Sequence, residues 1–190
     1  MTVDAGELMG VEAAPPRLAL PQKILARMST VLLAERLLAG TALNKLLFFA
    51  DALHQIRHHR TISGSGYTRL EYGTAALGMA QVKDYLLAGG YATRSVGACG
   101  DSVQSILTLS GAMRDHARLE LVRGCFWPEE LAALEEISAR LGDLQAVRLS
   151  ELVARTALWT RADWFGELDL AAACEDAGLR RVLAEAGILV

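Results

Sequence analysis

The strongest hydrophobic pattern of the chain lies in residues 43–56. Apolar positions recur there at spacings of three and four, as they do along one face of an α-helix: Leu43, Leu46, Leu47, Ala50, Leu53 and Ile56. Phe48 and Phe49 widen this stripe, so we expect a central helix that is buried on more than one side. Asp51 and His54 are three residues apart and share a face of that helix, which makes them the first candidates for function.

A second helical pattern precedes the central helix. From Pro21 to about Leu38 the apolar residues again follow a helical period, and Gly40 is expected to end this helix. Thr41 is then a suitable N-cap for the central helix.

A short strand is expected after the central helix. The Thr-Ile-Ser-Gly turn at 61–64 leads into an aromatic-bounded strand from Tyr67 to Tyr72, which Gly73 ends. A helix is expected to begin near Ala75 and to run as far as the glycine pair at 89–90.

Two more strands are predicted next, at 91–96 and 102–109, on either side of a glycine-rich turn at 97–100. This order is typical of a winged-helix module: a helix, a glycine turn, a strand, a glycine turn and a second strand. The segment up to Arg118 is expected to form a short helix or turn.

The last third of the chain has helical patterns at 127–142, 146–156, 169–175 and 177–187. Residues 1–17 show no sustained period and are expected to form a flexible leader. The predicted fold is therefore mainly α with a small β component: a helical domain around a central buried helix, with a winged-helix-like β-hairpin. It is expected to be a single domain over 18–190, with a core at 18–118 and a C-terminal helical part at 127–190.

Composition supports a packed protein inside the cell. Apolar residues make up 52% of the chain and charged residues 22%, which allows a sizeable core. The net charge of −3 gives no overall attraction to nucleic acid or to an anionic membrane. No apolar run approaches the roughly 18 residues of a membrane span, and no signal-peptide pattern begins the chain. We therefore expect a cytoplasmic protein.

The three cysteines are Cys99, Cys125 and Cys174. They are odd in number and far apart, so they indicate neither a disulfide framework nor a metal site. A reducing compartment suits them.

Four short motifs follow one another between Lys45 and Gly73. They are Lys45-Leu-Leu-Phe-Phe-Ala-Asp-Ala-Leu-His54, Ile62-Ser-Gly64, Tyr67 and Tyr72-Gly73. This series resembles the Panacea domain, the antitoxin family that includes the SocA-like antitoxins. The pattern of that family is K-L-L-Y-F-A-D-x-x-H, then I-T-G, then an aromatic residue, then Y-G-P-V-P. Leu149-Ser-Glu-Leu152 and Trp159 are similar to the family's downstream part, so the resemblance extends along most of the chain.

The chain departs from the family pattern at two places. Thr74-Ala75-Ala76 stands where the family has Pro-Val-Pro, and Val153-Ala154 stands where it usually has Ser-His before the late tryptophan. Neither change removes an apolar core position, so the expected fold is unaffected. Any function that depends on that loop or on the late histidine is affected, including neutralisation of a family-typical toxin.

The resemblance implies an antitoxin that binds a toxin protein directly and holds it inactive by occlusion. The toxin would be encoded separately, by an adjacent gene, and neither a cofactor nor a metal is implied. The implied contact face carries Asp51, His54, Tyr67 and Tyr72, with Arg57 and Arg69 at its rim.

Each polar feature also has a purely structural interpretation. Asp51 and His54 can form an internal hydrogen bond that fixes the helix to the strand. His54 and His58 have the spacing of a chelating pair, but no Glu or Cys completes the set, and the arginines at 57 and 60 repel a cation. Residues 57–60 are more simply a solvated basic helix end.

No catalytic set is evident in the sequence. The Ser-Gly-Ser-Gly run at 63–66 lacks the lysine that closes a P-loop, and it follows a helix instead of a strand. No nucleophile has an activating base nearby in the sequence. We therefore expect a protein that is not an enzyme.

Two other functions stay open. A winged-helix DNA-binding regulator, phage-derived or bacterial, is the first, but the helix at 75–88 offers only Gln81 and Lys83 to read bases and carries Asp84 as well. The second is a proteolytic adaptor that presents a client to a protease, which is compatible with the antitoxin role. The aromatic residues at 126, 127, 159 and 164 are not periodic with one another and are candidates for interface anchors.

Overall fold

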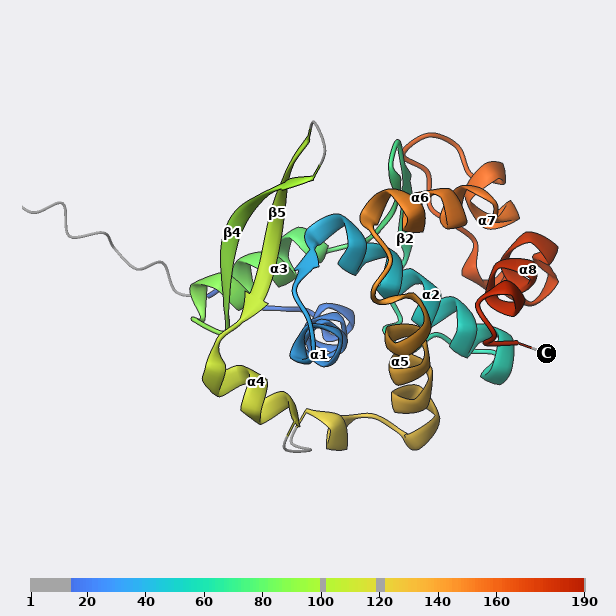
Figure 1. The fold of residues 1–190 in the computed structure, drawn as a ribbon. Helices are drawn as coiled ribbons and strands as arrows, with labels where there is room; N and C mark the ends of the chain where they lie inside the picture. The colour runs from blue at the N-terminus through green and yellow to red at the C-terminus, as the bar shows by residue number, and fades with distance from the viewer. Residues whose placement is uncertain (1–14, 100–101, 119–121, 190) are drawn as a thin grey trace, which may run out of the picture.

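The structure is a computed structural model that describes residues 15–99, 102–118 and 122–189. Most of the predicted leader, residues 1–14, lies outside the described residues, as does the tip of the glycine-rich turn at 100–101. The described chain is mainly α-helical with a small β component, as the sequence predicts (Figure 1).

The helices and strands follow one another in a mixed order. They are α1 Leu20–Ala34, β1 Leu38–Ala39, α2 Gly40–His58, β2 Tyr67–Leu70, β3 Gly73–Ala76, α3 Met79–Ala88, β4 Ala92–Cys99, β5 Ser102–Leu109, α4 Gly111–Arg118, η1 Arg123–Cys125, α5 Pro128–Leu141, α6 Ala146–Ala154, α7 Ala157–Arg161, η2 Leu170–Glu175 and α8 Ala177–Glu185.

Helix α2 is the centre of the molecule, and the other elements pack around it. It contacts α1, α5, α6, β3, β5 and η2. Every residue from Ala42 to His54 is buried, including Phe48 and Phe49. The prediction of a central helix buried on more than one side is therefore confirmed. One continuous cluster of buried apolar side chains joins the elements before α5 to those after it.

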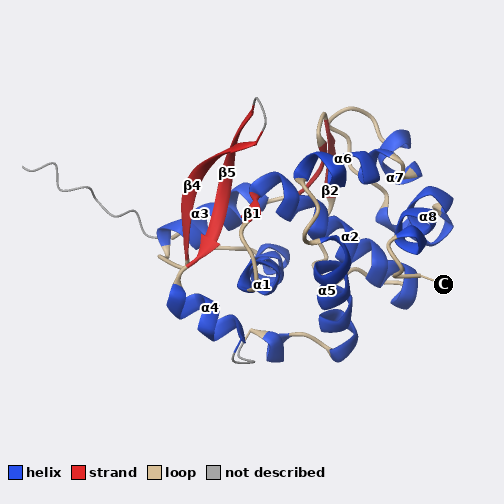
Figure 2. Ribbon diagram, viewed as in Figure 1, coloured by secondary structure: helices blue, strands red, loops and turns tan. Residues whose placement is uncertain are grey.

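The strands form two separate small sheets (Figure 2). One has the order β1-β5-β4 and is antiparallel, with the long β4–β5 hairpin projecting from the helical body. The other is the short β2–β3 hairpin, which lies across α2 beside α6. The two predicted strands at 91–96 and 102–109 are confirmed as β4 and β5, although β4 runs on to Cys99.

The predicted helix over 21–38 is too long at its C-terminal end. Helix α1 ends at Ala34, and Leu38–Ala39 forms β1, which pairs with Leu107 and Ile106 of β5. Gly40 was expected to end a helix but is the first residue of α2, whose N-cap is Ala39 and not Thr41. The partner strand of β1 comes about 70 residues later in the chain, so a local helical pattern could not reveal it.

The predicted strand over 67–72 followed by a helix from Ala75 is also wrong in its second half. The chain turns at residues 71–72 and returns as β3, with Tyr67 opposite Ala76 and Leu70 opposite Gly73; the next helix begins at Met79. Gly73 has a φ of +111°, a conformation that glycine adopts without strain. The glycine therefore sits within the hairpin and does not end the β structure.

Candidate functional site

A buried carboxylate joins α2 to the turn that follows it. Oδ1 of Asp51 accepts hydrogen bonds from the backbone N–H groups of Ile62 (2.7 Å) and Ser63 (2.8 Å). Oδ2 accepts from the hydroxyls of Ser63 (2.5 Å) and Tyr67 (2.7 Å). Asp51, Ser63 and Tyr67 are almost fully buried. Four donors therefore converge on one carboxylate and fix α2, the 61–64 turn and the start of β2 relative to one another.

Burial of this network shifts the pKa values of Asp51 and Tyr67. Burial raises the pKa of Asp51, while the hydrogen bonds from Ser63, Tyr67 and Ile62 act in the opposite direction. Burial together with the nearby Asp51 carboxylate raises the pKa of Tyr67 well above its ordinary value, so its hydroxyl stays protonated and donates a hydrogen bond to Asp51. The arrangement matches the structural interpretation in which the carboxylate fixes helix to strand.

His54 does not pair with Asp51. Its Nδ1 lies 2.7 Å from the carbonyl oxygen of Arg60, its Nε2 is buried without a partner, and its ring lies 4.6 Å from that of His58. Burial lowers the pKa of His54, which favours the neutral imidazole. The expected Asp51–His54 bond is absent because each side chain finds backbone partners in the turn that follows α2.

The sequence suggested that the basic end of α2 is solvated. In the structure, Arg57 and Arg60 instead bind residues of other elements. Arg57 donates to Glu136 (2.6 Å) and to the carbonyl oxygen of Ile188 (2.9 Å). Arg60 donates to Glu130 (2.6 Å) and Glu129 (3.1 Å) on α5. These ion pairs join α2 to α5 and the C-terminal segment, so Arg57 serves an internal contact.

The turn of the β2–β3 hairpin is held by two side chains from far along the chain. The hydroxyl of Ser150 in α6 donates to the carbonyl oxygen of Tyr72 (2.9 Å). The indole Nε1 of Trp159 donates to the carbonyl oxygen of Gly73 (2.7 Å). The Tyr72-Gly73 motif and the late Ser150 and Trp159 motifs, about 80 residues apart, therefore meet at one place in the fold.

A third segment joins the outer edge of β2. Arg69 of β2 makes two backbone hydrogen bonds to this segment: Phe165 N–H donates to the carbonyl oxygen of Arg69 (3.1 Å), and Arg69 N–H donates to that of Gly166 (2.9 Å). Phe165 has a φ of +61°, which is unusual for an aromatic residue, so the surrounding contacts impose its conformation. The residues at 163–167 are thus fixed beside the hairpin.

Aromatic side chains gather at this corner of the molecule. The guanidinium carbon of Arg69 lies 4.1 Å from the ring centre of Trp159 and 4.3 Å from that of Trp164. Nη1 of Arg69 also donates to the carbonyl oxygen of Ala162 (2.7 Å). Beside this stack the surface shows large aromatic residues: Tyr72 is 70% exposed, Trp164 56% and Phe165 79%. We call Tyr72, Trp164 and Phe165 the aromatic corner.

Lys45 lies beneath the hairpin turn, and Lys83 lies close to Lys45. A Cβ built on Gly73 would lie 2.8 Å from Cε of Lys45, so this side chain runs directly beneath the turn. Its Nζ donates to the carbonyl oxygen of Thr41 (3.0 Å), and burial, with a contribution from the nearby Lys83 ammonium, lowers its pKa to about 8. Burial lowers the pKa of Lys83 as well. Within the described ranges neither lysine forms an ion pair.

The lysine pair lies at the positive end of α2. A Cβ built on Gly40, the first residue of α2, would lie 3.0 Å from Nζ of Lys83. Two ammonium groups and a helix N-terminus therefore meet where the described residues supply no carboxylate, an arrangement that favours a negatively charged group from outside.

The six residues predicted to contact a partner occupy different depths. Asp51, His54 and Tyr67 are buried, and Arg69 is half-buried in its stack. Tyr72 is exposed at the turn. The hairpin thus joins Asp51, Tyr67, Arg69 and Tyr72 into one unit, whereas His54 and Arg57 belong to the opposite end of α2.

The sequence did not single out Phe165 or the lysine pair. Phe165 follows Trp164 in a segment without period, and only its pairing with β2 places it beside Arg69. Lysines are usually exposed, so burial of Lys45 could not be expected from residue type. Two signals were available: Lys45 opens the motif that resembles the family pattern, and Trp164 was a candidate interface anchor.

The Thr-Ala-Ala departure is accommodated within β3. Thr74 is buried, and its hydroxyl donates to the carbonyl oxygen of Thr68 across the hairpin (2.9 Å). Ala76 N–H lies 3.4 Å from Oδ1 of Asn44 in α2, a bond that a proline at this position could not make. The substituted residues therefore make hairpin contacts of their own.

These features define a class of protein: a small, mainly helical domain that presents a rigid hairpin turn on a buried helix. The chain belongs to a family of that class, described as antitoxin SocA-like, Panacea domain, which matches residues 43–160. The matched region begins in α2, ends in α7 and contains the whole hairpin unit. Comparisons with curated proteins and with solved structures gave no match.

The described residues contain neither a membrane-spanning helix nor a metal-binding cluster. No helix there combines the length and apolar character needed to cross a bilayer. No group of three or more His, Cys, Asp or Glu side chains within the same ranges is arranged to hold a metal ion.

Proposed function

We propose that the protein is an antitoxin that binds a toxin protein directly and holds it inactive by occlusion. Membership of the SocA-like antitoxin family supports the role, and the aromatic corner supports the place. Three large exposed aromatic residues, one on the hairpin turn and two on the segment that pairs with β2, are typical of the anchors that carry most of the energy of a protein–protein interface.

Rigidity is what makes this corner suitable for binding. Ser150 and Trp159 hold the backbone of the turn, and the buried Asp51 network holds the hairpin to α2. A surface that is ordered before binding loses little conformational entropy when the partner arrives. Asp51 and Tyr67 therefore act by supporting the contact face from below.

The lysine pair indicates that the toxin surface that docks here is negatively charged. Lys45 lies beneath the hairpin turn and Lys83 lies near it at the start of α2, and neither forms an ion pair with another described residue. An aspartate or glutamate of the toxin that docks against the half-buried Lys83 would pair with its ammonium group and gain from the positive end of α2, whereas Lys45 lies buried beneath the turn. No catalytic group is needed for this function, which is inhibition by covering the toxin.

The test is co-purification with the product of the adjacent reading frame, together with rescue of growth when that product is expressed. We expect a Tyr72→Ala, Phe165→Ala double variant to lose toxin binding and rescue while its melting temperature stays within a few degrees of wild type. Trp127→Ala is a matched control, because Trp127 is 65% exposed but lies at the start of α5, away from the hairpin. Failure of the wild-type chain to bind or neutralise that product contradicts the proposal.

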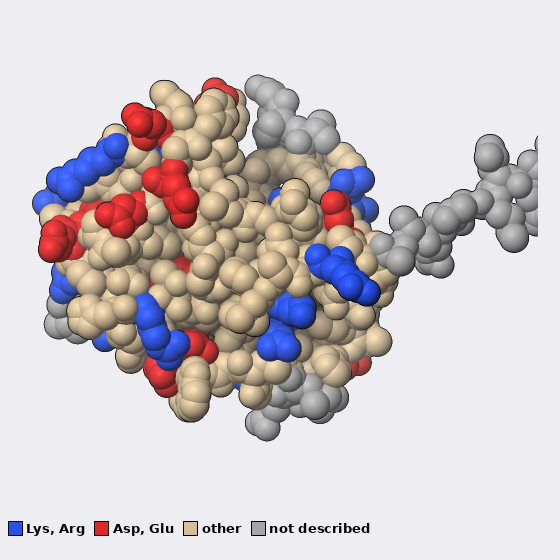
Figure 3. Space-filling model, turned by 180° about the vertical axis from the view of Figure 1, so that it is seen from behind, with Lys and Arg blue, Asp and Glu red and all other residues tan. Residues whose placement is uncertain are grey.

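One observation favours a second candidate, a winged-helix DNA-binding regulator. Strand β1 completes a three-stranded sheet of order β1-β5-β4, and α3 directly precedes the projecting β4–β5 hairpin. The net charge of −3 argues against this candidate, and on one half of the face in Figure 3 the described basic side chains lie among acidic ones. Salt-dependent retardation of the chain's own promoter DNA would support this candidate.

A further inference from the structure

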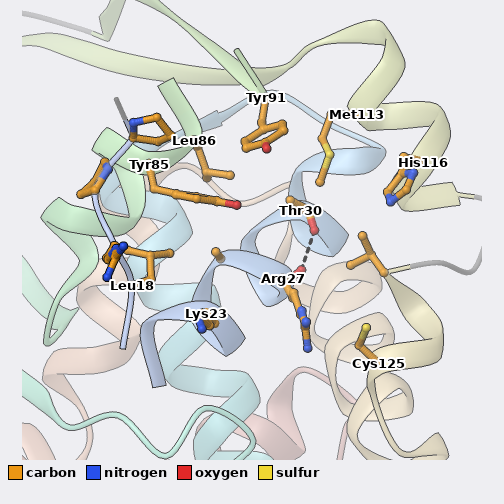
Figure 4. A pocket seen from close by; sticks show the side chains of 15 residues that line it. Leu18, Lys23, Arg27, Thr30, Tyr85, Leu86, Tyr91, Met113, His116 and Cys125 are labelled. Carbon is orange, nitrogen blue, oxygen red and sulfur yellow. Dashed lines mark hydrogen bonds between the residues drawn. The ribbon is translucent and has the colours of Figure 1, made fainter. Parts of the chain in front are cut away.

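A groove lies over α1, away from the hairpin, with a volume of about 760 Å³. It is bounded by α1, α3, α4, η1, the start of β4 and residues 15–18 (Figure 4). Pockets that bind small molecules have volumes of roughly 300 to 1,000 Å³. None of its lining residues belongs to the aromatic corner, so the groove is separate from the proposed toxin surface.

The charge of the groove is of one sign. Lys23 and Arg27 are four residues apart on α1 and share the face that forms its floor. Arg17 lines it as well, and none of the described lining residues is an aspartate or glutamate. Within the described parts of the chain, Lys23 and Arg27 form no ion pair. A cluster of cations in a chain of net charge −3 marks a local preference for an anion.

The opposite wall is aromatic and apolar. The rings of Tyr85 and Tyr91 lie 5.4 Å apart, and Figure 4 shows them beside Met113, across from Lys23 and Arg27 on α1. Leu86 lies behind these rings and is 1% exposed. The wall therefore offers a surface for a flat or apolar molecule.

We propose that this groove binds a small organic anion. Its aromatic or apolar body would lie against Tyr85, Tyr91 and Met113, and its acidic group would face Lys23 and Arg27. The site goes beyond toxin binding, because it gives the domain a second binding surface on different elements.

Fluorescence titration of the full chain with anilinonaphthalene sulfonate tests the proposal, because this probe joins aromatic rings to a negative group. Its uncharged analogue phenylnaphthylamine is the matched neutral probe. We expect the wild type to prefer the sulfonate, and a Lys23→Gln, Arg27→Gln double variant to bind the sulfonate about tenfold more weakly while its binding of the neutral probe stays unchanged.

Two control variants locate the site. Arg94→Gln with Arg140→Gln removes two exposed cations outside the groove and should leave both affinities unchanged. Trp164→Ala alters the aromatic corner and should also leave sulfonate binding intact. Loss of binding in Trp164→Ala, or unchanged sulfonate affinity in the Lys23, Arg27 double variant, would overturn the proposal. So would equal affinity of the wild type for both probes.

Discussion

The hydroxyl of Tyr67 donates a 2.7 Å hydrogen bond to Oδ2 of Asp51, and both side chains are fully buried. This bond links the middle of α2 to the first residue of the β2–β3 hairpin. Because Ser63 and two backbone N–H groups share the same carboxylate, one side chain fixes the whole connection between helix and hairpin. The exposed turn that carries Tyr72 depends on it.

Removal of the Asp51 carboxylate should be strongly destabilising. We expect Asp51→Ala to lower the free energy of unfolding by about 3 to 5 kcal/mol, since buried N–H and O–H donors lose their acceptor. Urea denaturation measures the change, and Asp84→Ala on the exposed side of α3 serves as the control. A loss below about 1 kcal/mol would show that the network is not a structural support.

Tyr67 and Asp51 should be energetically coupled. Tyr67→Phe removes only the hydroxyl and should cost about 1 to 2 kcal/mol in the wild-type background. In an Asp51→Asn background the cost should be smaller, because the charge-assisted bond is already gone. A double-mutant cycle on the unfolding free energies gives the coupling, and additive effects would argue against a direct interaction.

Gly73 should tolerate no side chain. Gly73→Ala combines a φ of +111° with a Cβ that would lie 2.8 Å from Cε of Lys45. We expect a loss of about 2 kcal/mol or more in the free energy of unfolding. Gly90→Ala is the matched control, because Gly90 has a φ of +66° and no atom within 4 Å of the built Cβ. If both variants lose the same amount, backbone conformation alone explains the cost and Lys45 does not press on the turn.

The buried Lys45 should give the protein a distinctive alkaline pH dependence. Its pKa is lowered from 10.5 to about 8 in the folded state, so between these values the unfolded chain binds more protons than the folded one. The free energy of unfolding should therefore rise with pH from about 8 to 10.5, by up to about 3 kcal/mol, as the cost of burying the charge is relieved.

Comparison with variants isolates this effect from other groups that titrate at high pH. Lys45→Met should remove most of the rise and leave the part that Lys83 contributes, because burial lowers the pKa of Lys83 as well; Lys23→Met on the exposed face of α1 should retain the whole rise. Because the chain has only three lysines, reductive methylation with a carbon-13 label should also let NMR follow each amine separately. A Lys45 signal that titrates at the ordinary value would contradict the burial of its charge.

The Arg69 stack should depend on guanidinium geometry. Arg69→Lys keeps the charge but loses the flat group between Trp159 and Trp164, together with the fixed bond to Ala162. We expect the free energy of unfolding to fall by about 1 kcal/mol and the amide of Phe165 to exchange faster with solvent. Arg161→Lys provides a control at an exposed arginine nearby, and equal exchange in both variants would exclude a positioning role for Arg69.

The sequence alone determined the helical character of the chain, the buried α2, the β4–β5 hairpin and the family motifs. Those features arise from local periodicity and short spacings, which neighbouring residues fix among themselves. The spacing of Asp51 and His54 also suggested a pair, but spacing shows only that two side chains share a face. Which partner each one finds depends on where the following turn lies.

The tertiary structure determined which residues from distant parts of the chain lie in contact. Only folding brings Ser150 and Trp159 to the Tyr72-Gly73 turn, places Phe165 beside β2, and buries Lys45 under Gly73. The same holds for β1, whose two residues become a strand because β5 offers them backbone partners. Contacts between residues far apart in the chain follow from how the elements pack on α2, and no pattern of neighbouring residues encodes that packing.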